Sequence, residues 1–210
     1  MTDNSQVAKA GSDGRARRRE RNVERVLDAL IHLAAEGKLD PSGEEIAERA
    51  GVSHRSLYRY FDDRASLQRA AIDRVMDQIA PLLDIADIGT GSLDHRITTF
   101  VAARTETYWA FGPIARTAFS GTWDVVREGI ESSRSALHDQ LVQQFAAELD
   151  MLNHSERQRT VAMLDVPFQF EALEYLAGHA GLDRDELVHA LESHLRQSLG
   201  PLAERLSVFE

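Results

Sequence analysis

The stretch that most constrains how this chain folds runs from Gly43 to Phe61 and reads GEEIAERAGVSHRSLYRYF. In its first half, Ile46, Ala47 and Ala50 share one face at a period of about 3.6 residues, and charged side chains occupy the other face. Gly51 follows where the chain must reverse direction, because glycine adopts the positive φ of such a turn without a steric penalty. The first half therefore predicts a short amphipathic helix that ends in a tight turn.

A second helix is predicted directly after the turn. Ser53 is a typical N-cap residue, and Leu57 and Phe61, four residues apart, point inward. The outward face carries polar, aromatic and basic side chains: His54, Arg55, Ser56, Tyr58, Arg59 and Tyr60. Two short helices joined in this way form a helix-turn-helix, whose second helix enters the DNA major groove. The alternative is a hairpin used only for packing, which has no need of such an exposed face.

The residues after the second helix sharpen this interpretation. The segment LYRYF at 57–61 is followed by two acidic residues, by Arg64, and by an apolar helix that begins at Leu67. Together with Ala47 and Gly51, this pattern resembles the DNA-binding domain of the tetracycline-repressor (TetR) family of bacterial transcriptional regulators. The resemblance covers roughly residues 20 to 75, and the remaining length and helical pattern fit that family's ligand-binding and dimerising half.

The resemblance implies that Tyr58, Tyr60 and Arg64 contact backbone phosphates, although the family more often has lysine where Arg64 stands. The first turn of the second helix, residues 54–56, would reach base edges, and Arg55 would read guanine with about 1–3 kcal/mol of discrimination. The predicted DNA-binding residues are Ser53, His54, Arg55, Ser56, Tyr58, Tyr60, Arg64, Arg17 and Arg18.

The net charge of −10 is unevenly distributed. Residues 1–74 contain 14 Lys and Arg against 13 Asp and Glu, whereas residues 75–210 contain 10 against 21. An acidic body still permits phosphate contacts by a few placed basic residues. An arginine run near the N-terminus is either a solvated tail or an arm on the DNA, and its position before a DNA-reading domain favours the arm. The run comprises Arg15, Arg17, Arg18, Arg19 and Arg21.

Helical periodicity without alternating strand patterns predicts an all-α protein. It would consist of an N-terminal three-helix helix-turn-helix DNA-binding domain and a C-terminal helical ligand-binding and dimerisation domain, with about nine helices. The predicted parts are a disordered basic arm at 1–16, the DNA-binding domain at 17–64 and the second domain at 65–210. The helices outside the helix-turn-helix are predicted at about 17–36, 63–81, 93–111, 114–120, 123–149, 156–180 and 184–199, the last extending up to 208.

Composition and motifs disfavour several classes of protein. Cysteine is absent, which excludes disulfides and thiolate zinc sites, and no apolar run approaches the ~18 residues of a membrane span. The eight histidines form no metal pair at helical spacing, and neither a glycine-rich phosphate loop nor a nucleophile motif occurs. We therefore expect a cytoplasmic protein that is not an enzyme and has no cofactor, metal or membrane partner.

The last two predicted helices are the candidates for a dimer interface. Leucines at 187, 191, 195 and 199 extend a near-heptad seam, and the helix before it is apolar nearly all round. The resemblance implies that these helices form a four-helix bundle with their symmetry mates. The predicted interface residues are Phe170, Leu173, Val188, Leu191, Leu195 and Leu199.

A ligand pocket is predicted among the aromatic residues of the second domain. Aromatic side chains at helical spacing are more often core than pocket, but the family has a ligand cavity in this region. Pro167 would also interrupt a helix at the same level. The pocket would be mostly apolar with a few polar groups, among them Arg116 or His138. The predicted ligand-binding residues are Arg104, Tyr108, Trp109, Phe111, Phe119, Trp123 and Phe168.

Arg104 lies on an apolar stripe and therefore needs a partner, since a buried unpaired charge is costly. Either Asp165 or Glu171 pairs with it in a buried ion pair, or it binds an anionic group of a ligand.

These features favour a sequence-specific DNA-binding transcriptional regulator, a ligand-released repressor that acts as a homodimer on a palindromic operator. Its partners would be double-stranded DNA, a second copy of itself and a small, largely apolar effector. The alternatives are an enzyme and a helical scaffold that binds only protein, which the arginine- and tyrosine-rich face disfavours.

Overall fold

The computed structural model describes residues 4–38, 40–119 and 126–206, with side chains from Gly14 onward except at 113–114, 117–119 and 126–133. These residues form ten α-helices, one 3-10 turn and one π turn, and no strand occurs among them, which confirms the all-α class. Two compact units are present: residues 1–77 with 113–127, and residues 78–112 with 128–210. The division falls after Asp77, within a helix, rather than after Arg64.

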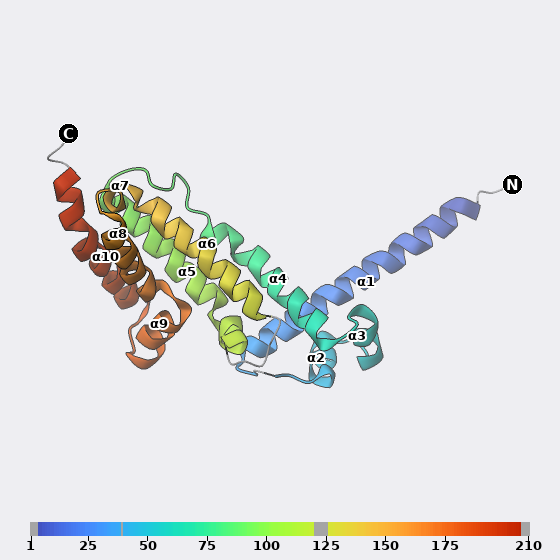
Figure 1. The fold of residues 1–210 in the computed structure, drawn as a ribbon. Coiled ribbons are helices and arrows are strands. Elements are labelled where there is room, and N and C mark those ends of the chain that lie inside the picture. The colour runs from blue at the N-terminus through green and yellow to red at the C-terminus, as the bar shows by residue number, and fades with distance from the viewer. Residues whose placement is uncertain (1–3, 39, 120–125, 207–210) are drawn as a thin grey trace. The chain divides into compact units, whose positions relative to one another are not determined.

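The first unit contains α1 (Asn4–Ala35), α2 (Gly43–Ala50), α3 (His54–Tyr60) and the start of α4 (Arg64–Leu83). Both short helices pack against the later part of α1 (Figure 1). The buried side chains come from the predicted inward faces, so local periodicity is sufficient to define this core. They include Val26, Leu27, Leu30, Ala34, Ile46, Ala47, Ala50, Leu57, Phe61, Leu67, Ala71 and Val75.

The start of α1 differs from the prediction. The helix begins at Asn4, so the segment predicted as a disordered arm at 1–16 is helical over most of its length, and the predicted start at 17 is wrong. Alanine, arginine, lysine and glutamine have high helix propensities, and here they outweigh Gly11 and Gly14. The side chains from Gly14 to Arg21 are exposed. The arginine run is therefore presented on a helix.

The second unit is built mainly from α5 (Leu93–Phe119), α6 (Val126–Gln144), α8 (His154–Asp165) and α10 (Arg184–Leu206). These helices lie side by side (Figure 1), the short α7 (Ala146–Leu149) connects α6 to α8, and the short α9 (Phe170–Glu174) follows α8. Their facing side chains form a single buried cluster, which includes Ile97, Phe100, Val101, Leu141, Phe145, Leu149, Leu164, Phe168, Leu187, Leu191, Leu195 and Leu199.

Two predicted helix boundaries in the second unit are wrong. α5 continues through Gly112 and Pro113 to Phe119, where a break and a separate helix at 114–120 were predicted. A proline removes one backbone hydrogen bond, which a long helix can tolerate, as α4 does at Pro81 and α10 at Pro201. The predicted helix at 123–149 is divided at Phe145, whose φ of −117° ends α6 before α7 begins. Residues 120–125 lie outside the described part.

Pro167 interrupts the predicted helix at 156–180, as expected. Asn153 caps α8, accepting a hydrogen bond from the backbone N–H of Glu156, and α8 ends at Asp165. A 3-10 turn at Val166–Phe168 follows, and Gln169 is extended, with a ψ of 146°. After α9, residues Tyr175–His179 form a π turn.

A buried ion pair fixes the loop before α5. Arg96 and Glu148 are 5% and 1% exposed, and the guanidinium donates to both carboxylate oxygens at 2.8 and 2.6 Å. Gln144 accepts at its carbonyl from Arg96 and at its side chain from the N–H of Gly89. All partners are within the second unit, so this cluster stabilises the fold of that unit.

No helix in the described ranges is both long enough and apolar enough to cross a bilayer.

Candidate nucleic-acid interface and ligand pocket

The turn between α2 and α3 has the geometry that its sequence predicts. Gly51 is left-handed, with φ 63° and ψ 39°, and the N–H of Val52 donates to the carbonyl of Ala47. Ser53 is extended and accepts a hydrogen bond from the N–H of Ser56 at 3.1 Å. α2 is also capped, since Ser42 and Glu45 form a capping box. Both helices therefore begin at defined residues, which fixes where each side chain of α3 points.

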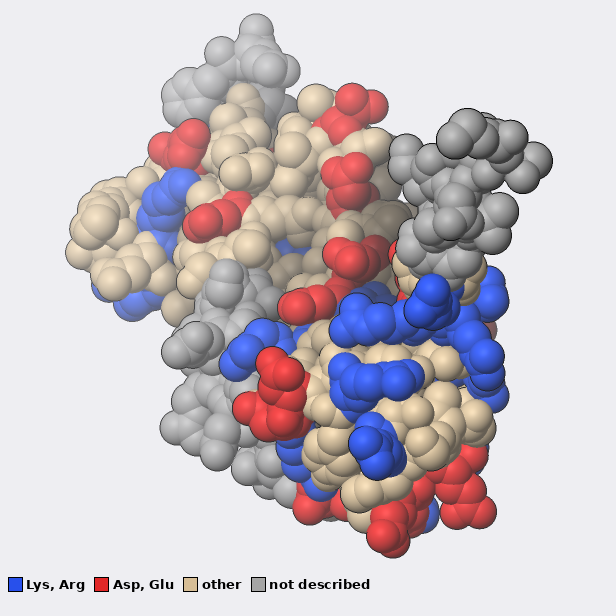
Figure 2. Space-filling view, turned by 90° about the vertical axis from the view of Figure 1, so that its right-hand side faces the viewer, with Lys and Arg blue, Asp and Glu red and all other residues tan. Residues whose placement is uncertain are grey.

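The faces of α3 separate as predicted. Leu57 and Phe61 are buried, whereas Tyr58 is 52% exposed. His54, Arg55 and Arg59 are exposed as well, and Ser56 and Tyr60 are half-buried. Figure 2 shows Lys and Arg side chains gathered over the surface formed by α1 and α3. α3 thus presents a basic and aromatic face.

Tyr60 is anchored to α1. Its hydroxyl oxygen accepts a hydrogen bond from Nδ2 of Asn22 at 3.0 Å, which lowers the pKa of Tyr60. The guanidinium of Arg59 lies 5.4 Å from the centre of its ring. Because the hydroxyl accepts from Asn22, its own proton remains to be donated to another acceptor, such as a phosphate. The sequence prediction did not include Asn22, whose contact with Tyr60 spans 38 residues.

Arg64 is held by the loop before α2. Its guanidinium forms an ion pair with Asp40 and donates to the carbonyl of Pro41 at 3.0 Å. It was predicted to contact phosphate, and a guanidinium has five N–H donors, so both roles are compatible. The pairing orients the side chain at the start of α4.

Gly43 allows α2 and α3 to approach closely. A Cβ added at Gly43 would lie 3.0 Å from the hydroxyl of Tyr58 and 3.2 Å from Nε2 of His54. The rings of these two residues meet edge to face, with centroids 4.8 Å apart. Gly43, which was not a predicted site residue, therefore leaves room for two predicted DNA-binding side chains.

Several arginines of α1 extend the basic surface. Arg17 and Arg18 lie on its exposed N-terminal part. Arg25 was missed: its Nη2 lies over the α2–α3 turn, where a Cβ on Gly51 would collide with it. Its spacing of four residues from Arg21 places both on one side of the helix and was the available signal.

Three of the aromatic residues predicted to bind ligand, Tyr108, Trp109 and Phe168, instead belong to the core or pack against it, which is the alternative given for them. Phe168 packs edge to face on Phe100 at 5.0 Å, and Tyr108 donates from its hydroxyl to Oε1 of Glu174 at 2.7 Å. Trp109 and Phe111 are half-buried. The side chains of Phe119 and Trp123 lie outside the described part of the structure.

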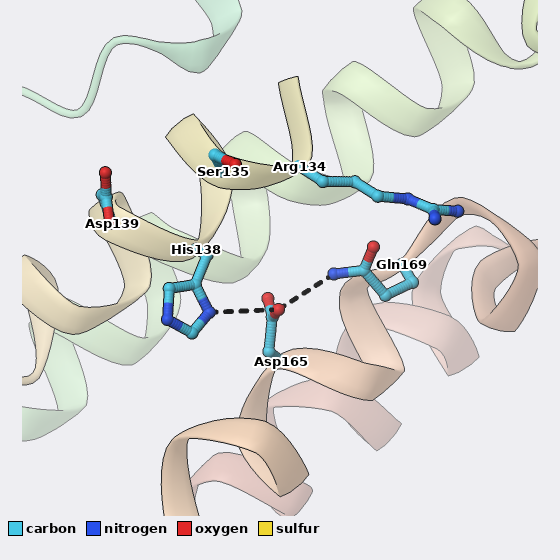
Figure 3. A pocket seen from close by; sticks show the side chains of 6 residues that line it. All are labelled: Arg134, Ser135, His138, Asp139, Asp165 and Gln169. Carbon is cyan, nitrogen blue, oxygen red and sulfur yellow. Dashed lines mark hydrogen bonds and ion pairs between the residues drawn. The ribbon is translucent and has the colours of Figure 1, made fainter. Parts of the chain in front are cut away.

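A hollow of about 510 Å³ lies between α6 and the end of α8 (Figure 3). All its lining side chains are polar, unlike the mostly apolar pocket predicted. Oδ2 of Asp165 is 3.4 Å from Nδ1 of His138 and accepts from Nε2 of Gln169 at 3.0 Å. Arg134, at the rim, forms an ion pair with Glu171. The lining residues are Arg134, Ser135, His138, Asp139, Asp165 and Gln169.

Arg104, on α5, is not among the residues that line this hollow and is 4% exposed. Its Nη2 donates to the carbonyl of Leu137 at 2.8 Å, and the guanidinium lies 4.5 Å from the ring centre of Phe100. No salt bridge joins it to either predicted partner within the described residues. Burial lowers the pKa of Arg104 to about 10, and the charge of Asp165 only partly opposes this.

Four of the six predicted dimer-contact residues are buried within their own unit, which corrects that prediction. Leu173, Leu191, Leu195 and Leu199 are at most 3% exposed, because the leucine stripe of α10 faces its own core. Phe170 and Val188 are half-buried. Among the described residues of the second unit, the exposed large apolar side chains are Met163 and Val166 at the end of α8, and Tyr175 in the π turn.

Residues 26–71 match the family model described as "Bacterial regulatory proteins, tetR family". The uncharacterized HTH-type transcriptional regulator Rv1255c of Mycobacterium tuberculosis is 39% identical over 85 residues, which are 38% of this chain and 41% of that protein. The HTH-type transcriptional repressor KstR of Mycolicibacterium smegmatis is 32% identical over 92 residues, 43% of each chain. The matches thus span about two fifths of these relatives.

Two solved structures share the fold over most of the chain. A transcriptional regulator from Rhodococcus sp. Rha1 has a TM-score of 0.61 at 21% identity, covering 85% of this chain and 96% of its own. A tetR-family transcriptional regulator from Streptomyces coelicolor has a TM-score of 0.64 at 22% identity, covering 89% of each chain.

Fold and recognition helix together define a helix-turn-helix protein with an all-helical second unit. Residues 26–71, which include this helix-turn-helix, are similar to the tetR family of bacterial regulatory proteins. Both curated relatives are named as transcriptional regulators and not as enzymes, in agreement with the non-enzymatic prediction.

Proposed function

We propose that this protein is a sequence-specific DNA-binding regulator of transcription, a repressor that acts as a homodimer on a palindromic operator and is released by a small effector. The observation that carries the proposal is the doubly capped helix-turn-helix, whose second helix exposes His54, Arg55 and Tyr58. Because its caps and buried residues fix its orientation, α3 can enter a major groove without rearrangement.

In this proposal each side chain has a defined role. Ser53 caps α3, and the first turn from His54 to Ser56 meets base edges. Tyr58, Tyr60 and Arg64 hold phosphates on either side. The basic part of α1, with Arg17 and Arg18, lies along neighbouring phosphates, and Arg25 adds a contact beside the turn. Such contacts release counterions, so affinity falls as salt rises.

The homodimer is proposed to form through the exposed sides of α8 and α10. Met163 and Val166 are 66% and 56% exposed and lie three residues apart on one side of the chain. Large apolar side chains exposed side by side mark an interaction surface more often than isolated ones do. Phe170 and Val188 remain candidates at its edge. A two-fold dimer presents two copies of α3, which requires a palindromic site.

The effector is proposed to act through the second unit. α4 contributes residues to both units as one continuous helix. A ligand that favours a shifted position of the second part of α4 would therefore change how α3 meets DNA.

The DNA proposal is tested by fluorescence anisotropy with the DNA upstream of the protein's own gene and an unrelated duplex of equal length. We expect tight binding to the first duplex only, with affinity that falls steeply with salt. If the protein binds the upstream duplex and the unrelated duplex equally weakly, the next experiment selects bound DNA from a pool of genomic fragments. Absence of any preferred sequence in that selection contradicts the proposal.

The dimer proposal is tested by sedimentation of Met163→Glu. We expect the wild-type protein to sediment as a dimer and the variant as a folded monomer, because a charge placed in an apolar interface is unfavourable. Arg157→Glu, on the same helix but ion-paired with Asp150, is the control and should remain dimeric. A dimeric Met163→Glu protein places the interface elsewhere.

A further inference from the structure

The hydroxyl of Tyr60 has both of its acceptor positions in use and its proton left over. Its oxygen accepts from Nδ2 of Asn22 at 3.0 Å and from Nη2 of Arg59 at 3.5 Å. A phenolic hydroxyl has two lone pairs and one O–H donor, so these contacts leave only the donor. Tyr60 donates to no residue that the structure describes, and the nearby hydroxyl of Ser56 is joined to that of Ser53 at 2.8 Å. An acceptor from outside the chain fits this position.

The surroundings of this O–H are cationic. Arg59 is exposed, and its guanidinium carbon lies 5.4 Å from the ring centre of Tyr60. The hydrogen bond from Asn22 is the main cause that lowers the pKa of Tyr60, and Arg59 contributes to the same shift. A lower pKa makes the O–H a stronger donor. A strong donor next to a guanidinium is an arrangement that binds an anionic oxygen.

Asn22 itself stands on a basic face of α1. Arg18 and Arg25, four residues before it and three after it, share its side of the helix, and both are exposed. The acidic residues of α1 nearest to it, Glu20 and Glu24, are each two positions away and point elsewhere. Lys and Arg side chains gather over the surface of α1 and α3 in Figure 2. The local field therefore favours an anion at Tyr60.

A phosphate of duplex DNA is the anion that fits this place on α3. The first turn of α3 is proposed to meet base edges, and Tyr60 lies six residues after His54, which is roughly 9 Å along a helix. The major groove is about 8.5 Å deep, so the end of α3 reaches the backbone when its start reaches the bases. A phosphodiester has acceptor oxygens and no donor, which matches what Tyr60 and Arg59 offer.

We propose that Arg59 and Tyr60 together form one binding site for a phosphate of the DNA backbone, in which Asn22 of α1 is a positioning residue. Tyr60 donates its O–H to one phosphate oxygen, and Arg59 donates to the other. Asn22 holds the hydroxyl so that its proton points away from the chain. Arg59 and Asn22 lie outside the predicted set of DNA-binding residues. The assignment rests on the proposed function, because it requires α3 to lie in a groove.

The test uses the full-length protein and the two duplexes of the anisotropy assay, each titrated at several salt concentrations. Arg59→Ala should weaken binding to both duplexes by the same factor and reduce the slope of log K against log salt by about 0.9, the value for one phosphate contact. Tyr60→Phe removes a donor but no charge, so it should weaken both about tenfold with little change of slope. Arg196→Gln is the charge-matched control in the second unit, where Arg196 pairs with Asp94 and Glu192, and it should bind like the wild type.

Asn22→Asp separates positioning from stability. An aspartate has the shape of asparagine but only accepts hydrogen bonds, so Tyr60 would donate its proton to α1 and not to DNA. We expect an unchanged urea midpoint and about tenfold weaker binding to both duplexes. Because the substitution also adds a negative charge, it is repeated in the Tyr60→Phe protein, where it should weaken binding clearly less. Equal losses in the two backgrounds would assign the effect to charge and overturn the positioning role of Asn22.

The outcomes distinguish this inference from the proposed function. Unchanged affinity for DNA in either Arg59→Ala or Tyr60→Phe overturns the shared phosphate site, and selective binding by the wild type would then still support the proposed function. A wild-type protein that binds both duplexes alike, but whose variants lose affinity and slope as expected, retains the phosphate site and contradicts sequence-specific regulation.

Discussion

Arg96 and Arg104 lie on the same helix, α5, and are buried to nearly the same extent, 5% and 4% exposed. Arg96 donates to both oxygens of Glu148 and to the carbonyl of Gln144, all within 2.9 Å. Arg104 donates to one carbonyl, and its Nη1 has no partner among the described residues. The same residue type thus occupies a complete site and an incomplete one within a single unit.

The difference separates a fully paired buried charge from a partly paired one. A fully paired buried ion can be lost only by leaving its partner buried and unpaired, which is strongly destabilising. A buried ion with a missing partner stabilises the fold less, and its deletion exposes no equivalent group. Arg104 is for this reason the less completely paired of the two buried arginines.

The largest expected effect is a loss of stability when the fully paired arginine, Arg96, is replaced. Arg96→Met leaves Glu148 buried without its cation, so we expect a loss of about 3–5 kcal/mol in the free energy of unfolding. Arg104→Met replaces a poorly paired cation with an apolar side chain and should change stability by about 1 kcal/mol or less. Urea unfolding followed by circular dichroism measures both variants.

The order of the two effects is the decisive result. Equal destabilisation by Arg96→Met and Arg104→Met would show that Arg104 is as structural as Arg96, and the comparison would fail. A double variant that also replaces Glu148 with Gln tests whether the loss at Arg96 comes from the unpaired carboxylate, because it should recover part of the stability.

An exposed arginine should affect binding rather than stability. Arg55 lies on the exposed face of α3, so Arg55→Ala should leave the urea midpoint unchanged and reduce discrimination between operator and mismatched DNA by about 1–3 kcal/mol. Competition anisotropy measures the loss. Arg69→Ala, an exposed arginine on α4, is the control and should keep full selectivity. Unchanged selectivity in Arg55→Ala contradicts its role at base edges.

A smaller effect is expected where a neutral hydrogen bond joins α1 to α3. Asn22→Ala should cost about 0.5–1.5 kcal/mol of stability, since it removes the bond to the hydroxyl of Tyr60. Tyr60→Phe and the double variant complete a thermodynamic cycle, in which the two losses should not add. Strict additivity would mean that the contact is not energetically coupled.

The smallest expected effect is a pH dependence at the capping box of α2. The hydrogen bond from Lys38, and those from Ser42, lower the pKa of Glu45 from 4.5 to about 2. A depressed folded-state pKa gives stability that is present above 4.5 and is lost as pH falls toward 2. The urea midpoint of the wild type should therefore fall more across this window than that of Glu45→Gln. Because Glu45 is exposed and screened, the difference should be small.

The helix-turn-helix was predictable because its determinants are local. The turn needs a left-handed residue at Gly51, α3 needs a cap at Ser53, and the inward positions repeat at the helical period. Each of these signals acts within four residues, so no knowledge of the rest of the chain is required. The interruption at Pro167 was predictable for the same reason.

Other features depended on competition between local signals. Gly112 and Pro113 predicted a break that α5 does not have, and no such pair marks the division at Phe145. Propensity also favoured helix at the start of α1, where polarity and glycine suggested disorder. Whether a glycine or proline ends a helix depends on the length and packing of the helix around it.

The sequence by itself determined the fold class, the position of α3 and the residues on its outward face. Tertiary structure alone decided that the leucine stripe of α10 faces its own core, that Tyr60 binds Asn22, and that Arg104 lacks a partner. An apolar stripe has the same period whether it meets its own chain or a second copy. Whether a buried charge is satisfied depends on atoms tens of residues away, and packing alone brings those atoms together.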